Sequence, residues 1–77
     1  MAKMQLLNQY TLMREDTGQF IREGDRIDSI TYYDEDLEFS ITEKNVEIVG
    51  IDDFGVEIKK DNGCYNYINL EFLEEFE

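Results

Sequence analysis

The sequence predicts a small, mainly β domain built around an antiparallel sheet. From Asp36 onward apolar and polar residues alternate with a period of two, which is the pattern of a strand with one buried and one solvated face. Asn62-Gly63 then supplies the pair that a two-residue type I′ hairpin turn favours. Hydrophobic residues make up 42% of the chain and aromatic residues 13%, more than an acidic disordered chain carries. We therefore expect a single acidic domain, residues 1–77, with about five strands.

Residues 4–14 fit two different elements. Four apolar side chains have helical spacing: Leu6, Leu7, Tyr10 and Met13. A hairpin that turns at Asp16-Thr17-Gly18 accounts equally for Tyr10-Thr11-Leu12 and for Phe20-Ile21-Arg22. The fold class is thus either mainly β or α+β with a short N-terminal helix.

Four strands are expected in the middle of the chain, beginning after Gly24-Asp25. The patterns place them at residues 27–33, 37–42, 46–51 and 56–59. Val46–Ile51 is apolar on both faces, which is typical of a central strand, and Gly50 indicates a bulge or a close backbone approach. Asp52-Asp53-Phe54-Gly55 is predicted to be a turn.

The C-terminal segment also leaves two alternatives open. After the Asn-Gly turn, Cys64, Ile68, Leu70 and Phe72 share one face of a predicted strand, and Tyr65, Tyr67, Asn69 and Glu71 share the other. The last residues, from Leu70 to Phe76, fit a short helical turn capped by Asn69 equally well.

The charge is strongly negative and uneven. The chain carries 19 carboxylates against 7 cations, a net charge of −12, and fourteen of these carboxylates against three lysines lie after Tyr33. A field of this sign attracts basic protein surfaces and repels nucleic acid and anionic membranes. We therefore expect a basic protein partner and no direct contact with nucleic acid or membrane.

Catalysis, metal binding and cofactor binding are not expected. The chain has no histidine to act as a general base, no glycine-rich phosphate loop, and a single cysteine, Cys64. The acidic run from Asp34 lacks EF-hand spacing, because Phe39 and Asn45 stand where glycine and glutamate are required. Residues 1–30 contain no long apolar run, and a free thiol suits a reducing compartment, so a cytoplasmic location is expected.

The segment Ile48–Lys59, followed by a tight turn and Tyr65–Ile68, resembles the second half of a small SH3-like or Sm-like β-barrel. The resemblance implies a barrel of about five strands that assembles through its edges. It also implies that Asp52 is the turn acid and that Phe54 stands where bacterial Sm-like RNA chaperones stack a base. Those chaperones follow their tyrosine with a Lys-His pair, whereas Ile68-Asn69 follows Tyr67 here, so RNA binding is not implied.

A partner-binding surface is predicted where tyrosines and carboxylates alternate. Tyrosine rings on the outer face of a sheet, with acids beside them, are suitable anchors for Arg and Lys side chains. The predicted residues are Tyr32, Tyr33, Asp34, Glu35, Asp36, Glu38, Asp52, Asp53, Tyr65 and Tyr67.

These features favour a small protein-binding module, an inhibitor or adaptor of the phage or mobile-element type. Its carboxylates would occupy a surface with which a partner protein normally contacts phosphates. In charge and size the chain resembles nucleic-acid mimics and anti-CRISPR proteins. The alternative is an SH3-like or Sm-like structural or regulatory barrel that self-associates into a homo-oligomer.

Overall fold

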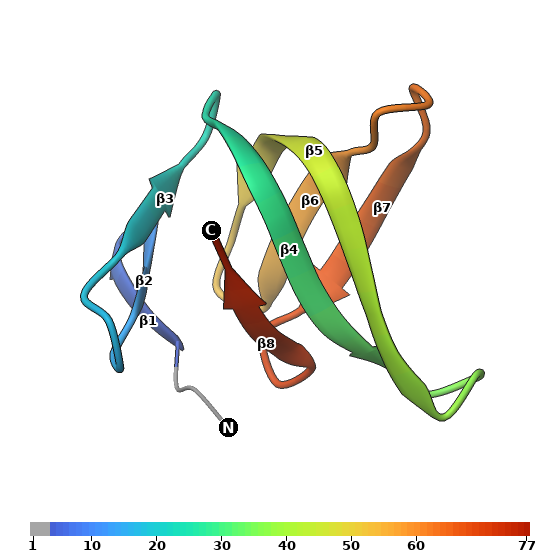
Figure 1. Cartoon of the computed structure of the whole chain (residues 1–77). Helices are drawn as coiled ribbons and strands as arrows, with labels where there is room; N and C mark the ends of the chain where they lie inside the picture. Colours follow the sequence, from blue (N-terminus) through green and yellow to red (C-terminus); the bar gives the residue numbers. More distant parts are fainter. Residues whose placement is uncertain (1–3) are drawn as a thin grey trace.

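The computed structural model describes residues 4–77, which form eight β-strands and no helix (Figure 1). The strands are β1 (Met4–Asn8), β2 (Thr11–Arg14), β3 (Phe20–Arg22), β4 (Arg26–Asp34), β5 (Phe39–Ile51), β6 (Gly55–Lys59), β7 (Tyr65–Asn69) and β8 (Leu73–Phe76). The predicted mainly β, antiparallel fold class is confirmed, with more strands than the five expected.

The α+β alternative was wrong, because the helical spacing near the N-terminus belongs to strands. β1 and β2 form an antiparallel pair, and β2 pairs in turn with β3. Leu12 and Ile21 lie opposite each other across β2 and β3, and both are buried. Burial of this cross-strand pair against the rest of the core stabilises the hairpin. An isolated amphipathic helix of this length would not gain the same stability.

The strands form two antiparallel sheets. The N-terminal sheet has the order β1-β2-β3, and the second sheet has the order β7-β6-β5-β4-β8. Figure 1 shows the N-terminal sheet beside the five-stranded sheet, with β8 between β4 and the N-terminal strands. One core fills the space between them, made of Leu12, Ile21, Ile30, Tyr32, Val46, Ile48, Ile51, Val56, Ile58, Ile68, Leu73 and Phe76.

The predicted closed barrel is wrong. β7 and β8 are the two edges of the five-stranded sheet and are not paired with each other. β8 is only four residues long and pairs with β4 around Ile30–Tyr32, so it does not reach across to β7. The side chains that a closed barrel would supply come instead from β2 and β3 of the N-terminal sheet.

β5 is long because it pairs with two other strands. Its first part pairs with β4 and its last part with β6, and the register shifts between Ile48 and Gly50. The bulge predicted at Gly50 is therefore confirmed. The strand predicted over residues 37–42 begins only at Phe39, because Leu37 belongs to the preceding turn, and it is continuous with the strand predicted over residues 46–51. Leu37 and Phe39 stay exposed because the β4–β5 hairpin extends beyond the core.

The hairpin at Asn62-Gly63 exists, but its turn type differs from the prediction. The amide of Gly63 donates to the carbonyl of Lys60 at 2.9 Å, and the amide of Lys60 donates to the carbonyl of Cys64 at 2.7 Å. Of the two residues Asn62 and Gly63, only Gly63 has a positive φ, 88°, whereas a type I′ turn needs a positive φ at both. The loop is a three-residue connection with Gly63 in the left-handed position.

Both alternatives for the C-terminal segment were wrong in part. β7 ends at Asn69, the chain turns, and β8 begins at Leu73. Asn69 stabilises the turn: its Oδ1 accepts from the amide of Glu71 and its carbonyl from the amide of Phe72. The turn redirects the chain to the free edge of β4, which a continued strand or a helix would not reach.

Candidate partner-binding surface

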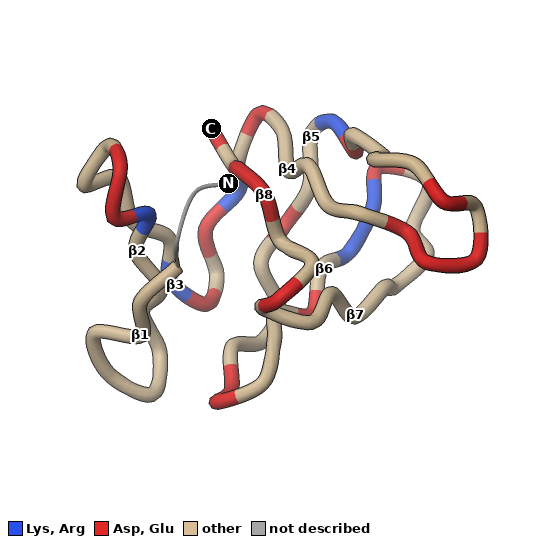
Figure 2. Tube along the Cα trace, turned by 90° about the horizontal axis from the view of Figure 1, so that it is seen from below, with Lys and Arg blue, Asp and Glu red and all other residues tan. Residues whose placement is uncertain are grey.

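The acidic run forms a tight turn between β4 and β5. Oδ1 of Asp34 accepts from the amides of Asp36 at 2.9 Å and Leu37 at 3.1 Å, and the Asp34 carbonyl accepts from the amide of Glu38. Glu38 has a φ of 59°, in the left-handed region. The carboxylate of Asp34 is therefore part of the turn itself, while Glu35 and Asp36 are exposed. Figure 2 shows this acidic turn at the end of the hairpin.

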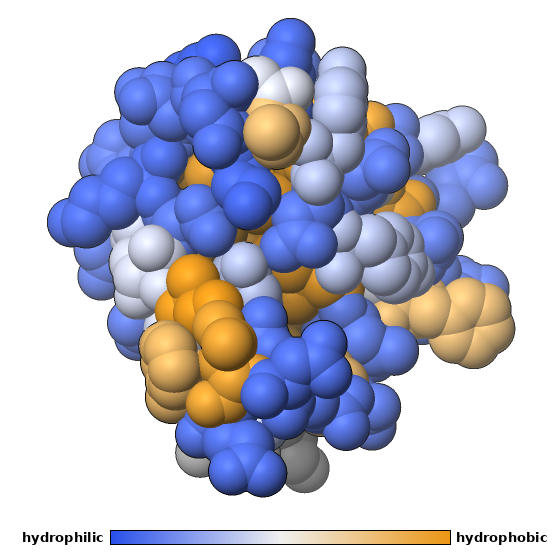
Figure 3. Space-filling model, turned by 90° about the vertical axis from the view of Figure 1, so that its right-hand side faces the viewer, coloured by the Kyte–Doolittle hydropathy of each residue, from blue (hydrophilic) through white to orange (hydrophobic). Residues whose placement is uncertain are grey.

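A pocket of about 210 Å³ lies between this turn and β7. Six of the ten predicted residues line it: Tyr32, Tyr33, Asp34, Glu35, Asp36 and Tyr67. The sequence prediction did not include the other four lining residues, which are Asn66, Ile68, Asn69 and Phe72. The pocket is thus the opening left where the edge of β7 and the end of β4 fail to close. Figure 3 faces this side of the molecule and shows apolar surface between hydrophilic side chains.

Tyr32 forms the floor of the pocket and is not an exposed anchor. Its ring is buried, and its hydroxyl donates to Oε1 of Glu43 at 3.3 Å and accepts from Nδ2 of Asn66 at 3.0 Å. Burial of the hydroxyl, reinforced by the nearby Glu43 carboxylate, raises the pKa of Tyr32. These bonds join β4 to β5 and β7 across the opening.

The exposed Tyr33 and the half-buried Phe72 form an aromatic pair beside the pocket. Their ring centroids are 6.4 Å apart, and the Tyr33 amide donates to the Phe72 carbonyl at 2.9 Å. On the other side of this pair lies a second hollow of about 430 Å³, lined by Tyr33, Glu71, Phe72 and Glu74. Carboxylates therefore flank the aromatic pair on both sides, and within residues 4–77 neither hollow is lined by a lysine or arginine.

Asp52 and Tyr67 are engaged with each other. The Tyr67 hydroxyl donates to Oδ1 of Asp52 at 2.7 Å, and the same oxygen accepts from the amides of Phe54 and Gly55 at 2.8 Å each. Burial and the hydrogen bond to Asp52 raise the pKa of Tyr67 to about 12. The hydrogen bond from Tyr67 holds the pKa of Asp52 below its usual value. The turn predicted at residues 52–55 is confirmed, and Asp52 stabilises it.

The remaining predicted residues lie outside the pocket. Glu38 and Asp53 are exposed in their turns, and Phe54, the position implied by the barrel resemblance, is 73% exposed. Tyr65 is exposed on β7, and Nζ of Lys59 lies 5.9 Å from the centroid of its ring. The structure thus brings Tyr32, Tyr33 and Asp34–Asp36 together with Tyr67 around one pocket. Tyr65, Glu38 and the Asp52-Asp53 turn do not line that pocket.

Besides Asn66, Ile68 and Asn69, the sequence prediction missed Phe72, Glu71 and Glu74 of this surface. Alternation along a single strand assigned Phe72 to the same face as the buried Ile68. The turn after Asn69 breaks that alternation and brings Phe72 beside Tyr33. The signal that was available is Asn69, whose side chain favours a turn over a continuous strand.

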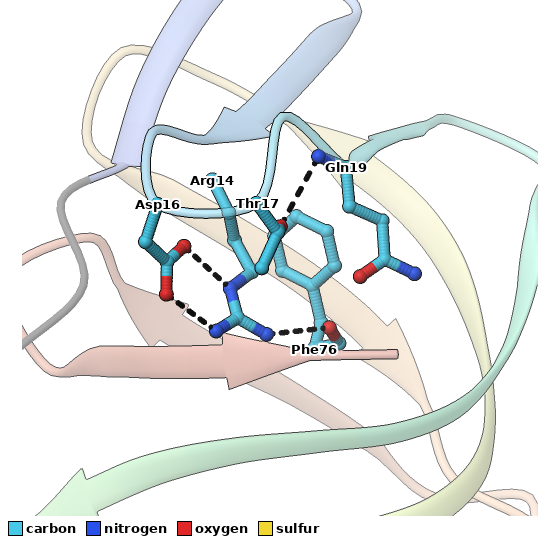
Figure 4. Close-up of polar contacts among 5 residues, drawn as sticks. All are labelled: Arg14, Asp16, Thr17, Gln19 and Phe76. Atoms are coloured by element: carbon cyan, nitrogen blue, oxygen red, sulfur yellow. Dashed lines mark hydrogen bonds and ion pairs between the residues drawn. The ribbon is translucent and has the colours of Figure 1, made fainter.

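Arg14 is a buried charged side chain outside this surface, and its contacts are structural. Its guanidinium forms a bidentate ion pair with Asp16, at 3.0 and 2.7 Å, and Nη1 donates to the carbonyl of Phe76 at 3.1 Å (Figure 4). The bond to the Phe76 carbonyl connects β2 of the N-terminal sheet to the end of β8.

Comparison with protein-family models, curated proteins and solved structures finds no match to this chain. Within residues 4–77, no three acidic, cysteine or histidine side chains gather in a way that would hold a metal ion, and there is no helix that could cross a membrane. Function is therefore inferred from the surface itself.

Proposed function

We propose that this protein is a small acidic binding module that engages a basic, nucleic-acid-binding surface of a partner protein, as an inhibitor or adaptor of the kind that phages and mobile elements encode. The observation that supports this most is the surface around the Tyr33–Phe72 pair, where an exposed and a half-buried aromatic ring lie between carboxylates, and no lysine or arginine of residues 4–77 lines the two hollows beside them.

The binding mechanism combines long-range attraction with a small contact surface. The net charge of −12 accelerates encounter with a basic surface, and this effect weakens as salt shortens the screening length. On contact, Glu35 and Asp36 pair with the Lys and Arg side chains that otherwise hold phosphates. The exposed ring of Tyr33 and the half-buried ring of Phe72 supply the apolar centre from which water is excluded. The chain needs no catalytic group or cofactor for this role.

Capture by the immobilised protein tests the proposal. The bait would be the parent or a variant in which Glu35 and Asp36 are changed to Lys, and Asp34 is kept because it stabilises the turn. The control bait changes Glu15 and Asp28 to Lys, which alters the net charge equally at two exposed residues that line neither hollow. A nucleic-acid-binding protein should be captured from a bacterial lysate by the parent and the control, less so at high salt, and poorly by the Glu35/Asp36 variant.

Competition with DNA or RNA then separates mimicry from general charge attraction. The captured protein, once purified, should be released from the bait by its own nucleic acid, because both ligands use the same cations. Capture that is unchanged in the Glu35/Asp36 variant, or that persists in excess nucleic acid, would rule out the proposed function.

A structural or regulatory role through self-association is the second candidate. It is favoured by the edge of β7, which pairs with no other strand of residues 4–77 and contains no charged residue. Mass measured against protein concentration distinguishes the two functions: a stable homo-oligomer supports this role, and a monomer supports the inhibitor.

A further inference from the structure

We infer that the basic partner segment binds in extended conformation along the open edge of β7, as an added strand, and places a cationic side chain in the pocket beside Asp34–Asp36. This inference rests on the proposed function and specifies how the partner is held.

The hydrogen-bond pattern of β7 shows which of its backbone groups are available. The amide of Leu70 donates to the carbonyl of Phe54, and the amide of Lys60 donates to the carbonyl of Cys64. Antiparallel pairs alternate between bonded and non-bonded, so between these two ends Asn66 and Ile68 bond to β6. The amide and carbonyl groups of Tyr65 and Tyr67 therefore point away from β6, toward the open edge.

This edge lacks the features with which sheets normally prevent strand addition. β7 has the sequence Tyr-Asn-Tyr-Ile-Asn, without a charge or a proline. The opposite edge of the same sheet, β8, carries Glu74 and Glu75. β1 is also an uncharged edge, but the acidic pocket lies beside β7.

The pocket lies where alternate side chains of an added strand would enter. Asn66 and Ile68 face the interior and line the pocket. Tyr65 and Tyr67 lie on the exposed face, and of these two only Tyr67 also borders the pocket. A partner residue opposite Asn66 or Ile68 would face the same way and enter the pocket. At about 210 Å³ the pocket is smaller than the roughly 300–1,000 Å³ of small-molecule sites, so it suits one side chain.

The charge of the lining selects a cation. Asp34, Glu35 and Asp36 supply the carboxylates, and no lysine or arginine of the described part of the chain lines the pocket. The planar fork of arginine pairs with carboxylates and stacks on tyrosine rings, both of which are present here. A second copy of this chain would instead bring its own carboxylates to the same place, which electrostatic repulsion disfavours.

Amide hydrogen exchange in the presence of defined peptides tests the added strand. The probe is a short capped peptide of alternating arginine and valine, and the charge control replaces arginine with glutamate. Saturating arginine-valine peptide should slow exchange at the Tyr65 and Tyr67 amides by about tenfold or more, because these amides gain a hydrogen-bond partner. The amides of Asn66 and Ile68, which already bond to β6, should change little. The glutamate peptide should have no effect.

Two further variants separate the strand from the charge. Methylating alternate backbone nitrogens of the arginine-valine peptide should weaken binding by about tenfold, because it removes edge hydrogen bonds while the arginines remain. Changing Glu35 and Asp36 to Lys should weaken binding of the unmethylated peptide, while the Glu15/Asp28 control variant should bind it as the parent does.

The outcomes distinguish this inference from the proposed function. If the peptide binds and depends on Glu35 and Asp36, but exchange at Tyr65 and Tyr67 is unchanged, the added strand is wrong and the proposed function stands. If the peptide does not bind, the inference is also wrong, and the capture experiment decides the function separately. Slower exchange at Tyr65 and Tyr67 with rising protein concentration alone would assign the edge to a second copy.

Discussion

Tyr67 is held in place by two neighbours that come from one turn. Its hydroxyl bonds to Asp52, and its ring lies against Gly55, where a Cβ atom would be 2.7 Å from Cζ of Tyr67 and closer still to the carbonyl oxygen of Ile68. The φ of Gly55 is not in the left-handed region, so its backbone conformation does not require glycine. Glycine is required at position 55 because a side chain would prevent the close approach of β6 and β7. This packing positions one wall of the pocket.

Changing Gly55 to Ala is expected to destabilise the protein by about 1–3 kcal/mol or more, because the methyl group meets a rigid backbone oxygen as well as a ring. Urea unfolding measures this. The matched control is Gly50→Ala, whose Cβ would lie 3.7 Å from Cβ of Glu57, an ordinary contact. Equal stability of the two variants would contradict the packing described for Tyr67.

The ion pair between Arg14 and Asp16 should govern stability in acid. The hydrogen bond from Arg14 lowers the pKa of Asp16 below its usual 3.8, so the folded state keeps this carboxylate charged where the unfolded chain protonates it. Its contribution is present above about pH 3.8 and is lost as the pH falls through the lowered value. Asp16→Asn is expected to lower the unfolding free energy at pH 7 and to make it less sensitive to acid.

Urea unfolding at a series of pH values measures this effect. The control is Asp53→Asn, an exposed carboxylate without a side-chain hydrogen bond among the described residues, which should behave as the parent does. If the Asp16 variant loses stability in acid as steeply as the parent, the ion pair is not the cause.

At the scale of elements, the β6–β7 hairpin determines where the open edge of β7 lies. The three-residue loop needs a left-handed residue only at Gly63. Asn62 contributes differently, because its Oδ1 accepts from the amide of Cys64 at 3.0 Å. The loop sets the register in which Lys59 lies opposite Tyr65.

Gly63→Ala is expected to cost roughly 1–2 kcal/mol, the penalty for an L-residue in the left-handed region, although no atom lies within 4 Å of the added methyl group. Asn62→Gly should also destabilise, because it removes the bond to Cys64, whereas a type I′ turn would tolerate glycine there. Thermal unfolding of both variants measures this, and a gain in stability from Asn62→Gly would restore the type I′ assignment.

At the scale of the whole molecule, repulsion among carboxylates opposes folding. The folded chain has a radius of gyration of only 11.3 Å and carries 19 carboxylates against 7 cations. Most charges lie within a few times the roughly 8 Å screening length at physiological salt, so added salt weakens their repulsion.

The melting temperature at pH 7 is therefore expected to rise between about 0.02 and about 0.5 M sodium chloride, as scanning calorimetry would show. The Glu15/Asp28 variant, with fewer negative charges, should show a smaller rise. A melting temperature that falls with salt would mean that ion pairs such as Arg14–Asp16 outweigh the repulsion.

How the two tyrosine pairs lie relative to each other depended on contacts between distant parts of the chain. Tyr32, Tyr33 and the acidic run were predicted together because they adjoin in sequence, and they do line one pocket. Tyr67 joins them and Tyr65 does not, because only the part of β7 from Asn66 to Asn69 lies beside the pocket. Phe72 was missed because the turn after Asn69 changes which face the following residues occupy.

The sequence by itself determined the strands in the middle of the chain, the turn at Asp52 and the uneven charge, because side-chain alternation, turn residues and charge are local properties. Tertiary structure decided the N-terminal strands, through burial of Leu12 against Ile21, and the open sheet, because β8 pairs with β4 and leaves β7 free. The pocket exists only through that choice of partner for β8. Strand pairing is a contact between residues far apart in sequence, and its free energy depends on which edges the folded core brings together.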